Sequence, residues 1–373
     1  MSELREMLTE TAERIFEDQM PSARAEIWPD ALWTALESAG FDRALMPEPA
    51  GGSGLGWADA YELLSVAGRH AAPVPLAEAM IANWLLNRAG IEVDGFVPIA
   101  PAIVTDSARL TRSAAGWTLE GSIPRVAWGR ASSHVAVVCE TSNGPLLVVI
   151  ARDATGVSMA EEFNLAGEPR DTLLFDGASP RAVAPSPIDS HSLLALAAIS
   201  RSALIAGAIA RILALTVEYA NLRVQFGRAI GKFQVIQQNL AVLATEAVAS
   251  KAASESGSEA IDTWLGGDGE PIVATLACAS AKIRAGEAAG RAAAIAHQVF
   301  GAIGFTEEHV LHQYTKRLWS WRDEYGSESY WARRLGERVI AAGREALWPT
   351  VTDTTVASGL TTTVAQRGGD ASA

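Results

Sequence analysis

Three carboxylates and a tyrosine lie close together in the stretch WRDEYGSESYW, residues 321–331. Asp323, Glu324 and Glu328 are of the residue type that can act as a general base, the group that removes a proton from a substrate. Gly326 interrupts the stretch and favours a turn at that point. The spacing alone permits either an acid/base site at a helix junction or a set of solvated charges.

The residues before Gly326 favour a structural role for these carboxylates. Apolar and aromatic residues recur there at alternating spacings of three and four: Leu311, Tyr314, Leu318, Trp321 and Tyr325. This spacing predicts one apolar face of a helix, which Tyr325 ends. Asp323 and Glu324 rotate away from that face, so we expect them to be solvated or to pair with a nearby cation. The cations within reach are Lys316, Arg317 and Arg322.

The junction has the residues that are typical of one helix ending and another beginning. Gly326 suits the end of the first helix, and Ser327 suits the cap of the next. Glu328 would then lie in a first helical turn, where the helix dipole favours a carboxylate. The local pattern therefore explains all three carboxylates without catalysis.

A second segment, NLRVQFGRAIGKFQVIQQNLA (221–241), interrupts a pair of predicted helices. Arg223 and Arg228 flank a glycine and lie near several amide side chains. A guanidinium offers a fixed fork of donors and glycine lets the backbone approach a ligand, so the segment could hold a diphosphate. An ordinary helix connection with solvated arginines explains the same residues, and composition alone favours that explanation.

A third segment, HQVFGAIGFTEEH (297–309), has the pattern QxxGxxG at the end of a predicted long helix. Gly301 and Gly304 would serve as C-terminal caps of that helix. Gln298 would then be buried and would only satisfy backbone groups. The local pattern again predicts structure and not chemistry.

Composition excludes several classes of function. The formal net charge of −13 argues against nucleic acid or an anionic membrane as the main partner. The six histidines show no HExxH spacing and the chain has no CxxC, so no metal site is expected. Cys139 and Cys278 lie in apolar runs, which predicts buried, inert thiols. The charged, amphipathic N-terminus is not typical of a signal peptide, and a cytoplasmic protein is expected.

Changes in residue pattern along the chain predict an α+β multidomain protein. Residues 1–96 have helical periodicity, whereas 97–187 contain short β-branched runs with turns every eight to twelve residues, typical of a small antiparallel sheet or barrel. Residues 188–348 return to long Ala- and Leu-rich helices, which predict a four-helix bundle. The tail, 349–373, lacks apolar periodicity and is predicted to be disordered.

Three motifs in this order resemble the acyl-CoA dehydrogenase family. They are the run RxQFGxxIxxFQxxQxxLA, the QxxGxxG pattern and a terminal W-x3-LG pattern, and the resemblance extends to about Trp348. It implies an N-terminal helical domain, a middle β-barrel and a C-terminal four-helix bundle. It also implies FAD as cofactor and oxidation of an acyl-CoA thioester to the 2,3-enoyl-CoA. In that reaction a carboxylate removes the α proton while the β hydrogen leaves as hydride.

The resemblance assigns roles that the residues alone did not. It implies that six residues contact the diphosphate and adenosine end of FAD, commonly across a subunit interface: Arg223, Gln225, Phe226, Gln234, Gln298 and Gly301. On this basis Arg223 and Gln298 are expected to contact a cofactor held by a neighbouring subunit.

The chain departs from the family pattern where catalysis is expected. The position that matches the family's catalytic carboxylate is Tyr325, and Glu324 lies one residue earlier, which turns a side chain by roughly 100° on a helix. A phenol, with a pKa of about 10, is a poor base at neutral pH. Glu324 remains an alternative candidate if a bulge remodels the loop. The family's alternative base position falls on Ala197 and Ala198.

The β region departs as well. The family's Thr-Glu…Gly-Ser-Asp loop has no counterpart in VPIAPAIVTDSARLTRSAAGW, residues 97–117. Ala127 occupies the place of the hydroxyl residue that contacts the flavin in the family. Both changes remove groups that would hold the isoalloxazine and the substrate.

These departures predict an acyl-CoA dehydrogenase-like subunit that works with a paralogous partner in a dimer or tetramer. The partner would supply the base, and an electron-transfer acceptor would reoxidise the assembly. Heteromers of this type degrade steroid side chains or other bulky acyl-CoAs, so lipid or steroid catabolism is expected by analogy. The alternatives are a flavin-dependent monooxygenase of the same fold and a non-catalytic scaffold subunit.

Overall fold

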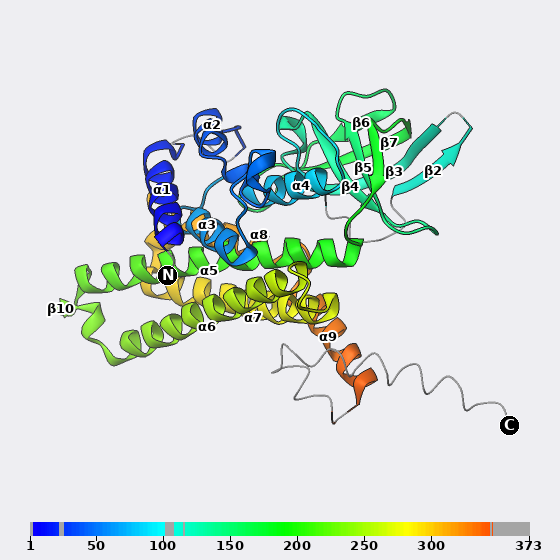
Figure 1. The fold of residues 1–373 in the computed structure, drawn as a ribbon. Helices are drawn as coiled ribbons and strands as arrows, with labels where there is room; N and C mark the ends of the chain where they lie inside the picture. Colours follow the sequence, from blue (N-terminus) through cyan, green and yellow to red (C-terminus); the bar gives the residue numbers. More distant parts are fainter. Residues whose placement is uncertain (1–2, 22–25, 101–107, 115, 344, 346–373) are drawn as a thin grey trace. The chain divides into compact units, whose positions relative to one another are not determined.

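In sequence order, helices precede and follow a β region in the computed structural model of the protein, as Figure 1 shows. The structure describes residues 3–21, 26–100, 108–114, 116–343 and 345. Two units are each compact, residues 1–200 and 201–373. The predicted α+β class is confirmed. The predicted boundaries near residues 96 and 187 stay predictions, and the tail from 349 lies outside the described residues.

The first unit begins with helices that bury apolar side chains. The helices are α1 (Glu3–Gln19), α2 (Asp30–Ser38), α3 (Trp57–Arg69) and α4 (Leu76–Arg88), with the short 3₁₀ helices η1 (Phe41–Arg43) and η2 (Glu48–Ala50). Phe16, Leu32, Leu63 and Leu85 are fully buried. Burial of such apolar side chains is the main stabilising term for amphipathic helices.

The β region forms two four-stranded sheets. One has the order β1-β4-β5-β8 and the other β2-β3-β7-β6. The strands are β1 (Ile99–Ala100), β2 (Ala108–Ser113), β3 (Gly116–Ala127), β4 (His134–Cys139), β5 (Leu146–Ala151), β6 (Val157–Ala160), β7 (Arg170–Ala178) and β8 (Ala182–Pro185), with the 3₁₀ helix η3 (Gly129–Ala131) after β3. All pairs are antiparallel except β1 with β4.

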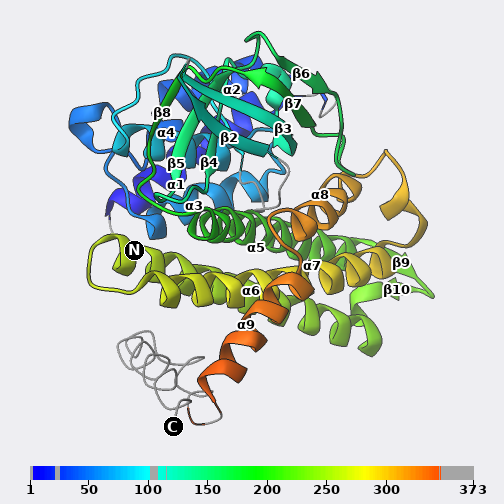
Figure 2. The ribbon, with the colours of Figure 1, turned by 90° about the vertical axis from the view of Figure 1, so that its right-hand side faces the viewer.

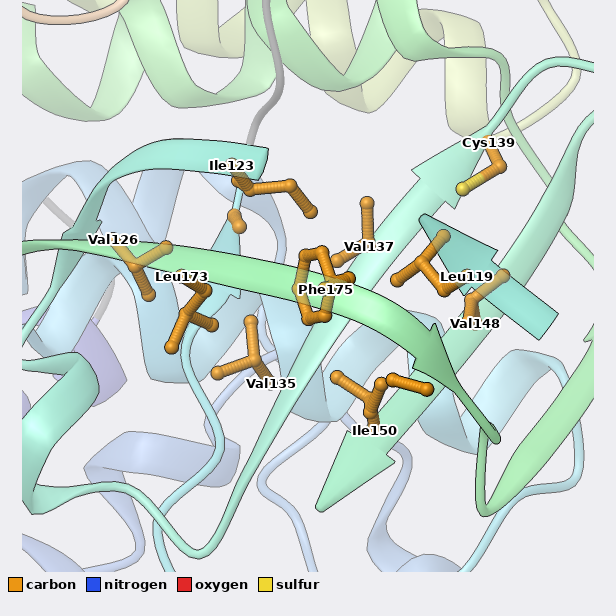
Figure 3. Close-up of a cluster of buried hydrophobic side chains, with 12 residues drawn as sticks. Leu119, Ile123, Val126, Val135, Val137, Cys139, Val148, Ile150, Leu173 and Phe175 are labelled. Atoms are coloured by element: carbon orange, nitrogen blue, oxygen red, sulfur yellow. The ribbon is translucent and has the colours of Figure 1, made fainter. Parts of the chain in front are cut away.

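One hydrophobic core joins the two sheets. Leu119 of β3 and Phe175 of β7 contribute from one sheet, and Val137 of β4 and Val148 of β5 contribute from the other. Figure 3 shows Phe175 in the middle of this cluster. The expected barrel is thus built as two sheets around a shared interior, as in other small β domains with aligned inner faces.

The second unit is a bundle of long helices. It contains the part of α5 (Ser190–Leu222) from Arg201 onward, α6 (Gln234–Leu265), α7 (Pro271–Phe300), α8 (Leu311–Asp323) and α9 (Glu328–Ala342). The hairpin β9 (Val224–Gln225) and β10 (Arg228–Ala229) and the 3₁₀ helix η4 (Ile230–Lys232) connect α5 to α6, and η5 (Gly301–Phe305) follows α7. Figure 2 shows α6, α7 and the hairpin in this bundle.

Helix α7 is the centre of the bundle because its small residues let neighbouring helices approach. Ala281, Ala285, Ala288 and Ala292 are fully buried, and α7 packs against α6, α8 and α9. Cys278 is buried on the same helix, and both it and Cys139 are free thiols, as predicted. Burial raises the pKa of the Cys139 thiol to about 11, which keeps it in the unreactive protonated form.

Helix α5 is the one helix in the described part of the chain that is long and apolar enough to cross a membrane. Its most apolar window is 94% buried in the structure. Long apolar helices in the core of a bundle pass the same test, so α5 is explained as a core helix.

Candidate functional site

The turn between α8 and α9, residues 324–327, occupies the position where the sequence predicts a base or its replacement. Helix α8 ends at Asp323, and Glu324 is extended. Tyr325 has a φ of 58° and Gly326 a φ of 95°, so both lie in the left-handed region. Ser327 then caps α9 by accepting a hydrogen bond from the Tyr330 amide, as predicted.

The prediction that Glu324 is solvated or pairs with a cation of α8 is wrong. Its carboxylate Oε2 accepts from Nε of Arg201 at 2.6 Å, and both side chains are buried. Because α8 ends at Asp323, the extended backbone at Glu324 turns its side chain into the bundle toward α5. A carboxylate paired with a buried guanidinium is a weaker base, because taking up a proton would break the ion pair.

The other two carboxylates lie as the pattern predicts. Asp323 is exposed at the end of α8. Glu328 lies in the first turn of α9 and its Oε1 is 2.5 Å from Nε of Arg322. Both are explained as structural charges at a helix junction.

Tyr325 is half-buried and is held by the same arginine. The Arg201 guanidinium carbon lies 4.7 Å from the centre of the Tyr325 ring, and Arg201 donates to the phenol oxygen at 3.4 Å. Trp331, which is fully buried on α9, donates from Nε1 to the Tyr325 carbonyl at 3.0 Å. Tyr325 therefore presents an aromatic ring that lies on a buried guanidinium.

Sequence reasoning missed Lys282, which lies beneath this turn on α7. It is fully buried, and its Nζ donates to the carbonyls of Arg322 at 2.6 Å and Gly326 at 2.9 Å. Burial lowers the pKa of Lys282 to about 7, against the opposite influence of the nearby Glu328 and Glu324 carboxylates. The available signal was its place four residues after Cys278 in an Ala-rich run, on the face that α7 buries.

Sequence reasoning also missed Arg201. It is a single charge in the apolar run SLLALAAISRSALIAGAIA, and it is 2% exposed. A charged residue in a core helix needs a partner, so its position could have predicted a buried ion pair. Nothing in the local sequence identified Glu324 as that partner.

The hairpin between α5 and α6 has the opposite character. Arg223, Gln225, Phe226 and Gln234 are all exposed, Phe226 at 92%. Phe226 and Gly227 form the two-residue turn, with φ of 52° and 80°. A large aromatic residue in this left-handed conformation is uncommon, and such strain is concentrated at functional sites.

Charge distinguishes this hairpin from the rest of the chain. Residues 221–241 contain Arg223, Arg228 and Lys232 and no acidic residue, in a chain with a net charge of −13. The Arg228 guanidinium lies 4.2 Å from the centre of the Phe233 ring, while the Arg223 side chain is exposed. The hairpin is therefore a local cationic surface with aromatic side chains.

The remaining predicted cofactor residues lie at the end of α7. Gln298 is exposed, contrary to the expectation from the helix pattern alone, and Gly301 caps α7 with a φ of 64°. Tyr219 of α5 stacks on Phe300 at 4.3 Å and donates to its carbonyl at 3.4 Å. This contact brings the start of the hairpin and the end of α7 to the same end of the bundle.

Known proteins share sequence similarity with most of this chain. Residues 190–339 match the family model described as "Acyl-CoA dehydrogenase, C-terminal domain". The chain is 27% identical to acyl-CoA dehydrogenase FadE27 of Mycobacterium tuberculosis, over 83% of this chain and 87% of the relative. It is 29% identical to acyl-CoA dehydrogenase IpdE2 of the same organism, over 84% and 91%. The chain is similar to acyl-CoA dehydrogenases, and residues 190–339 match the model of their C-terminal domain.

Solved structures share the fold of this chain. The chain resembles a variant of the Tcur3481-Tcur3483 steroid ACAD with a TM-score of 0.80 and 26% identity, covering 90% of this chain and 97% of that one. It has the fold found in the ChsE4-ChsE5 complex from Mycobacterium tuberculosis, with a TM-score of 0.82, 22% identity and coverage of 92% and 99%. Each of these two structures carries the names of two proteins.

The exposed residues of the hairpin fit the FAD that acyl-CoA dehydrogenases bind. The cationic hairpin suits a diphosphate, and Phe226 and Gln298 are both exposed. Gln298 also lines a surface pocket of ≈370 Å³ with His297, Phe305 and Trp319. Among the described residues, no cluster of His, Cys, Asp or Glu could hold a metal ion.

The other departures from the family concern buried or undescribed positions. Ala127 at the end of β3 is 1% exposed, and Ala197 and Ala198 on α5 are 1% and 0% exposed. Small apolar side chains there supply no proton acceptor. The region that lacks the Thr-Glu loop includes residues 101–107 and 115, which lie outside the described part of the chain.

Proposed function

We propose that the chain is a subunit of an FAD-dependent acyl-CoA dehydrogenase that oxidises the α,β bond of an acyl-CoA thioester together with a paralogous partner. One observation carries this proposal. The family's base position is Tyr325, and the adjacent carboxylate of Glu324 is 2.6 Å from the buried guanidinium of Arg201. A chain of this family without a base needs one from elsewhere.

The residues of this chain serve the bound cofactor and not the proton transfer. Arg223 and Arg228 would supply the guanidinium groups that neutralise its diphosphate, and the exposed ring of Phe226 would offer an apolar surface beside them. Gln298 supplies an amide at the same end of the bundle, and Gly301 leaves the backbone open to approach. When bound, FAD takes the β hydrogen of the substrate as hydride. The partner subunit supplies the carboxylate that takes the α proton, and an electron-transfer acceptor reoxidises the assembly.

The similar proteins favour a heteromer and a bulky substrate. The ChsE4-ChsE5 complex and the Tcur3481-Tcur3483 enzyme are each named for two proteins, and the latter is described as a steroid ACAD. By analogy, this chain acts in lipid or steroid catabolism as half of a two-chain dimer or tetramer.

The proposal is tested by purifying the chain alone and with each paralogue encoded beside it. FAD per chain is measured after denaturation, and flavin bleaching by acyl-CoA thioesters is followed without oxygen. We expect little flavin and no bleaching for the chain alone, and bound flavin that acyl-CoA bleaches for the correct pair. Full flavin occupancy and acyl-CoA oxidation by the chain alone would contradict the proposal.

The same experiment separates the two alternatives. A monooxygenase of this fold would hold flavin that an external reductase reduces and acyl-CoA does not. A scaffold subunit would leave flavin content and turnover of the pair unchanged when Arg223 is replaced by alanine.

A further inference from the structure

Lys282 ties together both ends of the turn that carries Tyr325. Its Nζ donates to the carbonyl of Arg322, in the last turn of α8, and to the carbonyl of Gly326, just after Tyr325. The two distances are 2.6 Å and 2.9 Å, and the lysine is fully buried. One side chain of α7 therefore holds the backbone on both sides of Glu324 and Tyr325.

The position of this ammonium has a physical reason. The last carbonyls of a helix have no partner within the helix and carry partial negative charge, so a cation at the end of α8 is favourable. Burial of an ammonium is otherwise costly and needs close compensation. The Glu324 and Glu328 carboxylates lie near enough to influence Lys282, and they supply part of that compensation.

The conformation that Lys282 holds is one that tyrosine does not prefer. Tyr325 has a φ of 58°, a left-handed conformation in which the Cβ is crowded. Such a conformation persists only where the surroundings over-determine it. Lys282 on one side and the Trp331 hydrogen bond to the Tyr325 carbonyl on the other provide that constraint.

We propose that Lys282 is the positioning residue of the base-position turn: it fixes where the side chain of residue 325 points. Arg201 holds the side chains of Glu324 and Tyr325 from α5. Lys282 of α7 binds the carbonyls of Arg322 and Gly326, the residues that flank them. The effect of Lys282 on the Tyr325 side chain follows from the contacts in the turn alone. The use of that effect in acyl-CoA oxidation rests on the proposed function.

The test follows Tyr325 directly by fluorine NMR of protein labelled with 3-fluorotyrosine. The chain has five tyrosines, and a Tyr325→Phe variant assigns the resonance of interest. In Lys282→Met we expect the Tyr325 resonance to shift or broaden while the other four stay in place. Lys251→Met is the matched control, because Lys251 is exposed on α6 and pairs across one helical turn with Glu255.

A second variant keeps the test decisive. Lys282→Gln retains an uncharged donor, so its Tyr325 resonance should lie between those of the wild type and Lys282→Met. A folded Lys282→Met or Lys282→Gln protein with a wild-type Tyr325 resonance would overturn the proposal. Loss of the fold in both variants would also overturn it, because Lys282 would then support the bundle as a whole.

A separate measurement, the response of the Tyr325 resonance to an acyl-CoA thioester, tests the proposed function. Addition of an acyl-CoA thioester to the wild-type pair should perturb the Tyr325 resonance. No perturbation would count against an acyl-CoA facing this turn, while the response to Lys282→Met would stand unchanged.

Discussion

The turn at 324–327 and the hairpin at 224–229 are the two regions of the bundle where the sequence resemblance predicts chemistry, and they are built in opposite ways. The turn is internally satisfied: Glu324 pairs with Arg201, and Lys282 and Trp331 hold the backbone. The hairpin is exposed and cationic, with Phe226 at 92% exposure. Residues that already bind one another are structural, whereas residues that face outward in a strained conformation are poised for a ligand or a partner.

The largest effect is expected from breaking the buried ion pair in the turn at 324–327. Glu324→Gln should lower the free energy of unfolding by about 3–5 kcal/mol, because it leaves the buried Arg201 charge without its carboxylate. Urea denaturation measures the change. Glu337→Gln is the control, since the Arg333–Glu337 pair is exposed and should contribute about 0.5 kcal/mol or less. A small effect for Glu324→Gln would show that the turn is not closed in solution.

The next largest effect is expected in the exposed hairpin at 224–229 and the adjacent Arg223. In the assembled pair, Arg223→Ala should weaken FAD binding by about 1.5–3 kcal/mol, the value of one hydrogen bond to a charged group. Flavin retention on dilution measures this loss. Arg333→Ala, an exposed arginine on α9, should retain flavin fully. Equal retention by both variants would argue for the scaffold alternative.

A pH effect is expected at Lys282. Its pKa is about 7 in the folded protein and about 10.5 when unfolded, so the unfolded chain binds more protons between these values. The contribution of Lys282 to stability should therefore rise from pH 7 toward pH 10, by at most about 1.4 kcal/mol per pH unit. The measurement is the unfolding free energy of wild type minus that of Lys282→Met at pH 7 and pH 9. The groups that influence Lys282 are Arg201, Asp323, Glu324 and Glu328. A constant difference would contradict the lowered pKa.

The smallest effect is expected from Phe226→Gly, which should raise the stability of the chain and lower the flavin content of the pair. Phe226→Gly should stabilise the chain by up to about 1 kcal/mol, because glycine accepts the φ of 52° without strain. The same change should reduce flavin content of the pair, because the exposed ring is lost. Thermal unfolding and flavin content measure the two effects. Loss of stability would mean that the ring already packs within this chain.

The break between α5 and α6 was predictable from sequence because its signal is local. The motif RxQFG, the turn glycine and the lack of acidic residues all lie within about twenty positions. The helices, the β region and the Ser327 cap were predictable for the same reason, since periodicity and capping depend on near neighbours.

The interior of the turn was not predictable because its partners are distant. Glu324 is 123 residues from Arg201, and Lys282 is 40 and 44 residues from the carbonyls it binds. The prediction extended the helix past Asp323 and so placed the Glu324 side chain toward solvent. In the structure α8 ends at Asp323, and the side chain of Glu324 points into the bundle. Only the tertiary packing of α5, α7 and the turn decides this.

The rate at which an acyl-CoA thioester bleaches the flavin of the assembled pair tests the central claim most directly when this chain carries Tyr325→Phe. If the partner supplies the base, the rate should equal that of the wild-type pair. A fall of about 10²-fold or more, the usual contribution of a general base, would show that Tyr325 itself takes the proton and would contradict the account.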